Sequence, residues 1–285
     1  MKTNNEPIGF TAYWQEVLDE VSALSGGPVE IEELPIRSNE TSIAHTARFE
    51  GIGGYPLFAY FTVPRGDGPF PALFQTPGYG SVVGVPAYRR RSRFAVMALC
   101  HRGQRLSDSG YSAAYPGLLT EGLPHADFYR WRDVVADCLR AMDVFTARPE
   151  VDATRLAAVG MDLAAIAAAL RPETPFMLVT SMTLRAAVDR APRTQAYPLQ
   201  ELNDYGRTHP RDAETVAATL SLFDPLAFAS RITARSLLTC NSGEFEYVEP
   251  VIDAMVGEGR IEFRTGRGFL DHQVEEHWLE QELGA

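Results

Sequence analysis

An aspartate lies where the chain is expected to turn sharply from a buried strand into a helix of small residues. The short apolar run 156–159 predicts a buried strand, and the alanine-rich stretch 164–170 predicts a buried helix. A strand, a glycine, one polar residue and such a helix form the layout of a nucleophile elbow, usually written G-x-S-x-G. The five residues here are Gly160-Met161-Asp162-Leu163-Ala164, so the sequence predicts Asp162 in the place of the serine.

An aspartate in that place would favour a chemistry different from that of serine. A serine hydroxyl needs a neighbouring base, whereas an ordinary aspartate is already ionised near pH 7. Attack of the aspartate carboxylate on an acetyl carbonyl gives a mixed anhydride, an intermediate that offers little advantage over the starting ester. Its attack on a saturated carbon gives an ordinary ester that activated water can cleave. A structural alternative also exists, because aspartate is a favoured cap of a following helix.

Strands alternate with helices on both sides of Asp162, which predicts an α/β fold with a mostly parallel sheet and helices on both faces. Helices are expected at 10–24, 127–146 and 274–283, with the aromatic residues of the first as core anchors. Strands 44–49 and 57–63 predict an antiparallel hairpin at a sheet edge. The other expected strands are 72–76, 94–100, 156–159, 176–180, 236–240 and 261–263.

The chain is expected to form a single domain over 1–285. An N-terminal helix and hairpin would occupy 1–65, and the core would comprise 66–184 and 231–285. Between the two core segments, about 185–230 is polar and helical and is interrupted by Pro192, Pro198 and Pro210. This segment is expected to form a lid over the site.

Composition and net charge indicate which binding partners and which cellular compartment are expected. A net charge of −11 argues against nucleic acid or an anionic membrane as a partner. There is no apolar leader and no run of membrane-spanning length. Cys100, Cys138 and Cys240 are scattered, which favours a reduced, cytoplasmic protein over a disulfide framework. No metal-ligand spacing or phosphate-binding loop is present, so neither a metal nor a cofactor is expected.

Two groups of charged residues are expected to be structural. The basic run 89–93 predicts a solvated helix face, and Arg102 with Asp137 predicts an ion pair.

An ordered set of short motifs then runs along the chain: Phe10-x-x-x-Trp14, Phe49-x-Gly51-x-Gly53-Gly54, Pro77-Gly78-Tyr79-Gly80, Arg102-Gly103-Gln104, Phe128-Tyr129-Arg130 and Tyr197-Pro198. This set resembles the acetyl xylan esterase and cephalosporin C deacetylase family of α/β-hydrolases over nearly the whole chain. The resemblance implies an α/β-hydrolase fold with N-terminal antiparallel edge strands, a helical lid, hydrolysis of carboxylic esters and a closed homo-oligomer.

The resemblance also implies a set of site residues. Asp162 aligns with the family's nucleophile, His272 with its histidine and Glu246 with its acid, with Glu244 as the near rival. The backbone N–H groups of Tyr79 and Leu163 would form the oxyanion hole. Tyr197 and Tyr205, in the expected lid, are the candidate substrate-binding residues.

The sequence thus predicts a hydrolase with an atypical Asp-His-Glu triad that acts on a small ester or related metabolite without a cofactor. Three alternatives remain open. They are an epoxide- or halide-cleaving hydrolase with an aspartate nucleophile, a lyase or isomerase of small-molecule metabolism, and a non-catalytic binding protein of the same fold.

Overall fold

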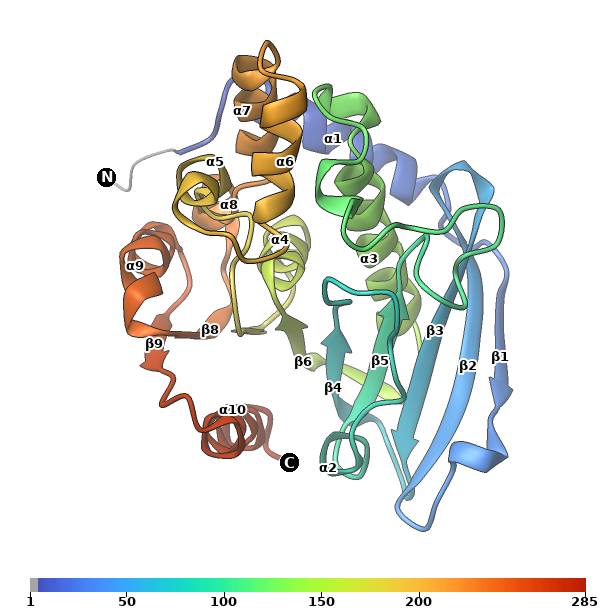
Figure 1. Cartoon of the computed structure of the whole chain (residues 1–285). Helices are drawn as coiled ribbons and strands as arrows, with labels where there is room; N and C mark the ends of the chain where they lie inside the picture. Colours follow the sequence, from blue (N-terminus) through green and yellow to red (C-terminus); the bar gives the residue numbers. More distant parts are fainter. Residues whose placement is uncertain (1–4) are drawn as a thin grey trace.

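A nine-stranded sheet forms the centre of the molecule in the computed structural model, which describes residues 5–285 (Figure 1). The strand order is β1-β2-β3-β5-β4-β6-β7-β8-β9. The first three strands and the β3–β5 pair are antiparallel, and all pairs from β5 to β9 are parallel. The strands are β1 (Val29–Glu33), β2 (Ser42–Gly51), β3 (Tyr55–Pro64), β4 (Phe70–Gln75), β5 (Ala95–Cys100), β6 (Val151–Gly160), β7 (Phe176–Val179), β8 (Arg235–Cys240) and β9 (Gly259–Phe263).

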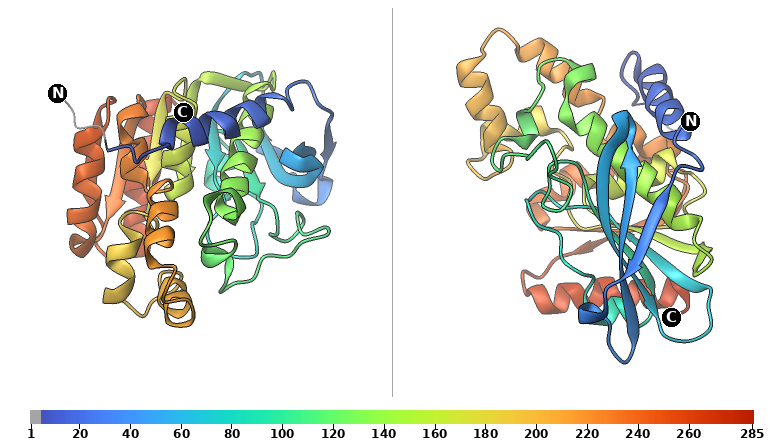
Figure 2. Two further views of the ribbon diagram at one scale, coloured as in Figure 1. Left: turned by 90° about the horizontal axis from the view of Figure 1, so that it is seen from above. Right: turned by 90° about the vertical axis from the view of Figure 1, so that its right-hand side faces the viewer.

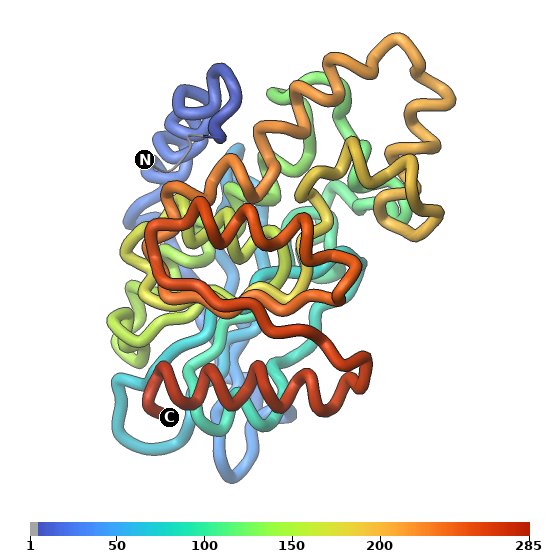
Figure 3. The backbone as a smooth tube through the Cα atoms, turned by 90° about the vertical axis from the view of Figure 1, so that its left-hand side faces the viewer, coloured from blue at the N-terminus to red at the C-terminus, as the bar shows by residue number. Residues whose placement is uncertain are grey.

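Helices cover both faces of this sheet. The helices are α1 (Phe10–Ser22), α2 (Tyr88–Arg91), α3 (Arg130–Thr146), α4 (Asp162–Leu170), α5 (Ala187–Arg190), α6 (Gln200–Thr208), α7 (Ala213–Ser221), α8 (Pro225–Phe228), α9 (Phe245–Ala254) and α10 (Gly268–Leu283). On one face lie α1, α3, α4, α8 and α9, and on the other lie α2 and α10 (Figure 3). Side chains alternate between the two cores along a strand, as pleating requires: Phe74 faces the first and Leu73 the second. The predicted fold class is confirmed.

The N-terminal helix is anchored by aromatic packing, as predicted. Trp14 is fully buried, and its indole N–H donates to the Leu222 carbonyl at 3.0 Å. Its ring contacts Phe223 and Phe228 edge-on or tilted, with centroids 5.2 Å apart in each case. Helix α1 is therefore fixed to the segment that precedes β8.

Two expectations about individual elements need correction, and a third is incomplete. The hairpin of β2 and β3 is not at the edge, because the mostly exposed strand β1 pairs outside β2. The basic run is solvated as predicted but is also ion-paired, because the exposed Arg89 and Arg93 pair with Glu280 of α10, at 2.9 and 2.8 Å. The closing helix starts at Gly268 rather than at 274, so it includes His272.

Helices α5, α6, α7 and α8 lie in the insertion between β7 and β8, and α6 and α7 project from the body of the molecule (Figure 2). The three cysteines are buried and free. Over residues 5–285, none of the helices combines the length and the apolar character that a membrane crossing requires.

Candidate active site

The turn between β6 and α4 consists of one residue, Met161. Strand β6 ends at Gly160, and helix α4 begins at Asp162. A Cβ on Gly160, whose φ is +157°, would lie 2.0 Å from the Thr76 hydroxyl oxygen, so only glycine fits there. The strand-to-helix turn is the place of the nucleophile in this type of elbow. Met161 occupies the turn itself, and the predicted nucleophile position, Asp162, is the first residue of α4. The φ of Met161 is −106°, so the backbone is not in the strained left-handed region.

Asp162 is buried in the first turn of α4 and is 2% exposed. Its two carboxylate oxygens accept the backbone N–H groups of Leu184 and Thr183, each at 2.8 Å. Burial raises the pKa of this carboxyl from 3.8 to about 6, against the opposing effect of the two N–H donors. Through these two hydrogen bonds the carboxylate links the segment after β7 to α4. Asp162 is not among the residues that line the cavity beside the turn, and no side chain caps the start of α4.

The raised pKa makes a testable contribution to stability. Between about pH 4 and 6 the folded protein holds a proton on Asp162 that the unfolded chain has released. Stability therefore falls as pH rises through this window, by about 3 kcal/mol for a shift of roughly two units. Urea unfolding of the native protein and Asp162→Asn should show their free-energy difference changing by this amount between pH 4 and 7. A pH-independent difference would contradict the assignment.

His272 lies in α10 and forms a pair with a residue that the sequence did not single out. Its Nδ1 lies 3.2 Å from the carboxylate of Glu275, which is buried, whereas the imidazole side chain is 75% exposed. The spacing of three residues within a helix could have predicted this contact. In residues 5–285, no hydrogen bond or ion pair links His272 to Asp162 or to Glu246. The predicted triad is not assembled.

The two candidate acids lie in different surroundings. Glu246 is exposed in the first turn of α9. Glu244 lies in the loop after β8, and its Oε2 accepts the Asn241 backbone N–H at 3.0 Å. Its Oε1 lies 3.8 Å from Arg190 Nη2 and has no hydrogen bond from the described residues. The structure thus puts Glu244, rather than Glu246, beside the elbow.

A cavity of about 470 Å³ adjoins the turn at Met161. It lies between the elbow, the segment after β7, the start of the insertion and the loop after β8. Its polar and aromatic lining includes Ser181, Thr183, Arg190, Arg193, Thr194, Tyr197, Glu244 and Tyr247. Such a volume is typical of small-molecule sites. We refer to it as the elbow cavity.

Two arginines of this cavity are held in fixed positions. Arg190 Nη1 donates to the carbonyls of Met182 and Arg185, at 2.5 and 3.2 Å, and its guanidinium lies over the Tyr247 ring. Arg193 donates to the Tyr247 hydroxyl at 3.2 Å. The sequence did not lead us to predict these two arginines as site residues. A pair of arginines shortly before Tyr197 in an acidic chain could have indicated them.

The two lid tyrosines have different positions. Tyr197 lines the elbow cavity, and its hydroxyl donates to Asp204 at 3.3 Å. Tyr205 donates to Asp212 at 2.9 Å and lines a separate cavity within the insertion. The structure therefore brings only the first of them to the elbow.

The loop that carries Tyr79 is fixed from two sides. Gln104 Nε2 donates to the carbonyls of Gly80 and Gly78, at 2.7 and 3.2 Å. The Tyr79 hydroxyl donates to Glu201 of α6. Leu163 is buried in α4, and with Met161 at the turn the next N–H along the chain belongs to Asp162. The oxyanion hole formed by the Tyr79 and Leu163 N–H groups stays a prediction.

Known proteins share this architecture. The model of the acetyl xylan esterase (AXE1) family matches residues 1–243, a match that ends one residue before Glu244. An acetyl xylan esterase from Paenibacillus sp. R4 superposes with a TM-score of 0.82 at 23% identity, covering 97% of this chain and 95% of that one. Acetyl xylan esterase 1 from Thermoanaerobacterium sp. JW/SL YS485 gives 0.79 at 22% identity, covering 98% and 96%. A puromycin-hydrolyzing peptidase of Mycobacterium tuberculosis gives 0.61 at 17% identity, covering 87% and 40%.

Proposed function

The chain belongs to the acetyl xylan esterase family and is an esterase-like hydrolase, and we propose that it cleaves a small ester in the elbow cavity with water as the nucleophile. In this proposal Glu244 removes the proton from the water. The observation that carries the proposal is that the turn residue Met161 lines the same cavity as a carboxylate, Glu244, whose Oε1 accepts no hydrogen bond from the described residues.

The side chains at the elbow argue against covalent catalysis. The thioether of Met161 has no proton to lose and is only a weak hydrogen-bond acceptor. Asp162 is an unsuitable nucleophile because both of its carboxylate oxygens are bound to backbone N–H groups inside the protein. In this proposal the nucleophile is therefore water that enters from solvent.

Glu244 is the one carboxylate among the residues that line the elbow cavity. Its Oε2 is fixed by Asn241, which leaves Oε1 able to accept a proton from water. The hydroxide oxygen adds to the ester carbonyl carbon, and a tetrahedral oxyanion forms. When this intermediate collapses, the alkoxide leaves and takes the proton back from Glu244, so the products are the acid and the alcohol.

Arg190 and Arg193 supply the positive charge that the oxyanion requires. Fixed cations near developing negative charge stabilise a transition state more than a ground state. Arg190 is well suited to this role, because two backbone carbonyls hold one of its amino groups and Tyr247 packs against its face. The same guanidinium lies 3.8 Å from Glu244, so it brings positive charge beside this carboxylate.

The first test is hydrolysis of 4-nitrophenyl acetate by the native protein and by Asp162→Asn. We expect both proteins to turn over, with kcat/KM within about threefold of each other, because the Asp162 side chain does not line the elbow cavity. Loss of activity in a folded Asp162→Asn would contradict the proposal. So would a native protein that binds small esters without cleaving them, which would indicate a non-catalytic member of the family.

We also propose that the protein is cytoplasmic and forms a homo-oligomer. The three free, buried cysteines suit a reducing compartment, and assembly is carried over from the resemblance alone. Cell fractionation and light scattering measure these properties directly, and a secreted or monomeric protein would contradict them.

A further inference from the structure

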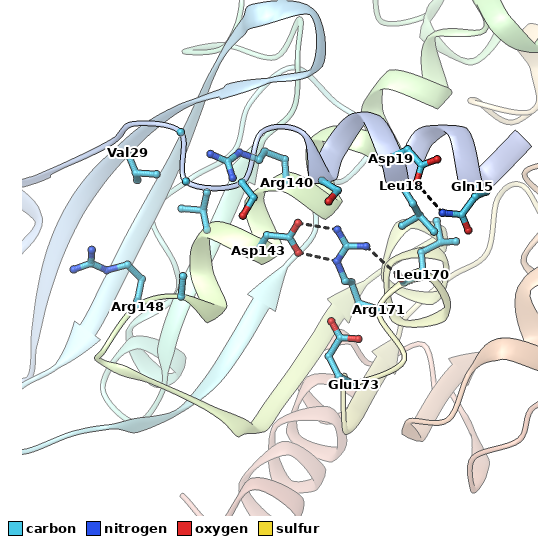
Figure 4. Close-up of a pocket in the computed structure, with 16 residues that line it drawn as sticks. Gln15, Leu18, Asp19, Val29, Arg140, Asp143, Arg148, Leu170, Arg171 and Glu173 are labelled. Atoms are coloured by element: carbon cyan, nitrogen blue, oxygen red, sulfur yellow. Dashed lines mark hydrogen bonds and ion pairs between the residues drawn. The ribbon is translucent and has the colours of Figure 1, made fainter.

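A second cavity, of about 650 Å³, lies away from the elbow (Figure 4). It is enclosed by α1, the loop that follows α1, the C-terminal half of α3 and the loop after α4. Leu170 and Arg171, at the end of α4, line it. Because the elbow is at the other end of α4, about 13 Å of helix separates the two cavities. We refer to this one as the Arg140 cavity.

Arg140 differs from the other arginines of the described chain that are almost fully buried. Arg102 and Arg132 are 6% and 8% exposed, and each pairs with a carboxylate at 2.7 Å. Arg140 is 5% exposed, yet its Nε donates only to the Glu50 carbonyl, at 3.2 Å. No carboxylate within 5–285 forms an ion pair with it. Buried charges are normally paired, whereas this guanidinium lines a cavity without an ion pair among the described residues.

The carboxylates that line the cavity with Arg140 do not pair with it. Asp143 accepts two hydrogen bonds from Arg171, both at 2.7 Å (Figure 4). Asp19 accepts from Gln15 at 2.9 Å, and Glu173 is exposed at the rim. Burial lowers the pKa of Arg140, with Asp143 opposing the shift, whereas the pKa values of Arg102 and Arg132 are raised.

The lining also selects the kind of anion. Leu18, Val144, Ala147 and Leu170 form an apolar wall beside Arg140. Arg171 neutralises Asp143, and Arg148 pairs with Glu150. Asp19 and Glu173 therefore remain as the negative charges in the lining, and they repel a dianion more strongly than a monoanion. A carboxylate matches the planar fork of a guanidinium and can accept two parallel hydrogen bonds from it. The lining therefore favours a monoanionic carboxylate with an apolar body.

We propose that the Arg140 cavity is a second ligand site, which binds a small organic carboxylate. The carboxylate pairs with the terminal amino groups of Arg140, and its apolar part packs against the wall formed by α1, α3 and α4. This site is independent of the elbow cavity and of its chemistry.

Calorimetric titration with benzoate tests this assignment, with benzamide as the neutral probe of the same shape and inorganic phosphate as the dianion. Benzoate should bind the native protein more tightly than either. Arg140→Gln should weaken benzoate binding at least about tenfold, the loss of one charge-assisted pair. The matched control is Arg65→Gln, because Arg65 Nε also donates to a backbone carbonyl but lies on the surface. It should bind benzoate as the native protein does.

A second variant, which keeps Arg140, distinguishes loss of the binding site from a folding defect caused by Arg140→Gln. Ser25 is exposed at the rim of the cavity, so Ser25→Trp should block the site without disturbing the core. Loss of benzoate binding in this variant, with native ester hydrolysis, supports the second site. Equal binding of benzoate and benzamide, no binding of benzoate, or binding that survives both Arg140→Gln and Ser25→Trp would overturn it.

Discussion

Replacement of Glu244 by glutamine is expected to lower kcat/KM for ester hydrolysis by about 10²–10⁴-fold, the usual contribution of a general base. Glutamine keeps the size of the side chain and one oxygen for the Asn241 N–H. It cannot accept the proton of the attacking water. Since Glu244 is the one carboxylate lining the elbow cavity, no neighbouring acid can replace it. Steady-state kinetics with 4-nitrophenyl acetate measure the loss.

Glu246→Gln is the matched control. It makes the same chemical change two residues away, at an exposed position in α9 outside the elbow cavity. We expect native kinetics from it. If Glu246→Gln is inactive and Glu244→Gln is active, the acid predicted from the sequence is the functional one and the proposal fails.

Asp137→Ala is expected to reduce the free energy of unfolding by about 3–5 kcal/mol, because it leaves Arg102 as a buried charge without its main partner. Asp137 is fully buried in α3, and its Oδ2 accepts both the backbone N–H and Nε of Arg102, at 2.9 and 3.0 Å. Its Oδ1 accepts Nη2 at 2.7 Å. The predicted ion pair between these residues is confirmed. Denaturant unfolding followed by circular dichroism measures the change.

Asp133→Ala separates this effect from a general loss of negative charge. Asp133 contacts the same arginine at 3.1 Å, but its side chain is 23% exposed, and Arg102 keeps its buried partner when Asp133 is removed. Its cost should be about 1 kcal/mol or less. Equal costs for the two variants would show that burial of the pair is not what makes it strong.

The arrangement of the sheet was predictable because it depends on apolar runs separated by turns. The runs that became β4 to β8 are hydrophobic on both faces, which is typical of parallel strands covered by helices. Strand β1 was missed because Val29 and Ile31 alternate with glutamates and stay largely exposed. Helix α9 was missed because Pro250 lies inside it, and proline normally indicates a helix boundary.

The candidate site was harder to predict because it depends on a register of one residue. The glycine at 160 and the small residues after Asp162 allow two placements of the elbow, with either Met161 or Asp162 at the turn. Only the backbone decides between them, since the strand continues to Gly160 and Asp162 is already helical. A misplaced helix boundary also affected His272, because its helix begins six residues before the predicted start.

The most direct test of water as the nucleophile is peptide mapping of the protein quenched with acid during turnover of 4-nitrophenyl acetate. The account predicts that the peptide containing Asp162, and every other peptide, stays free of acetyl groups from the first turnover onward. It also predicts that nitrophenol appears linearly, without an initial burst. An acetylated Asp162, or a burst equal to the concentration of protein, would contradict the account and restore the aspartate as the nucleophile.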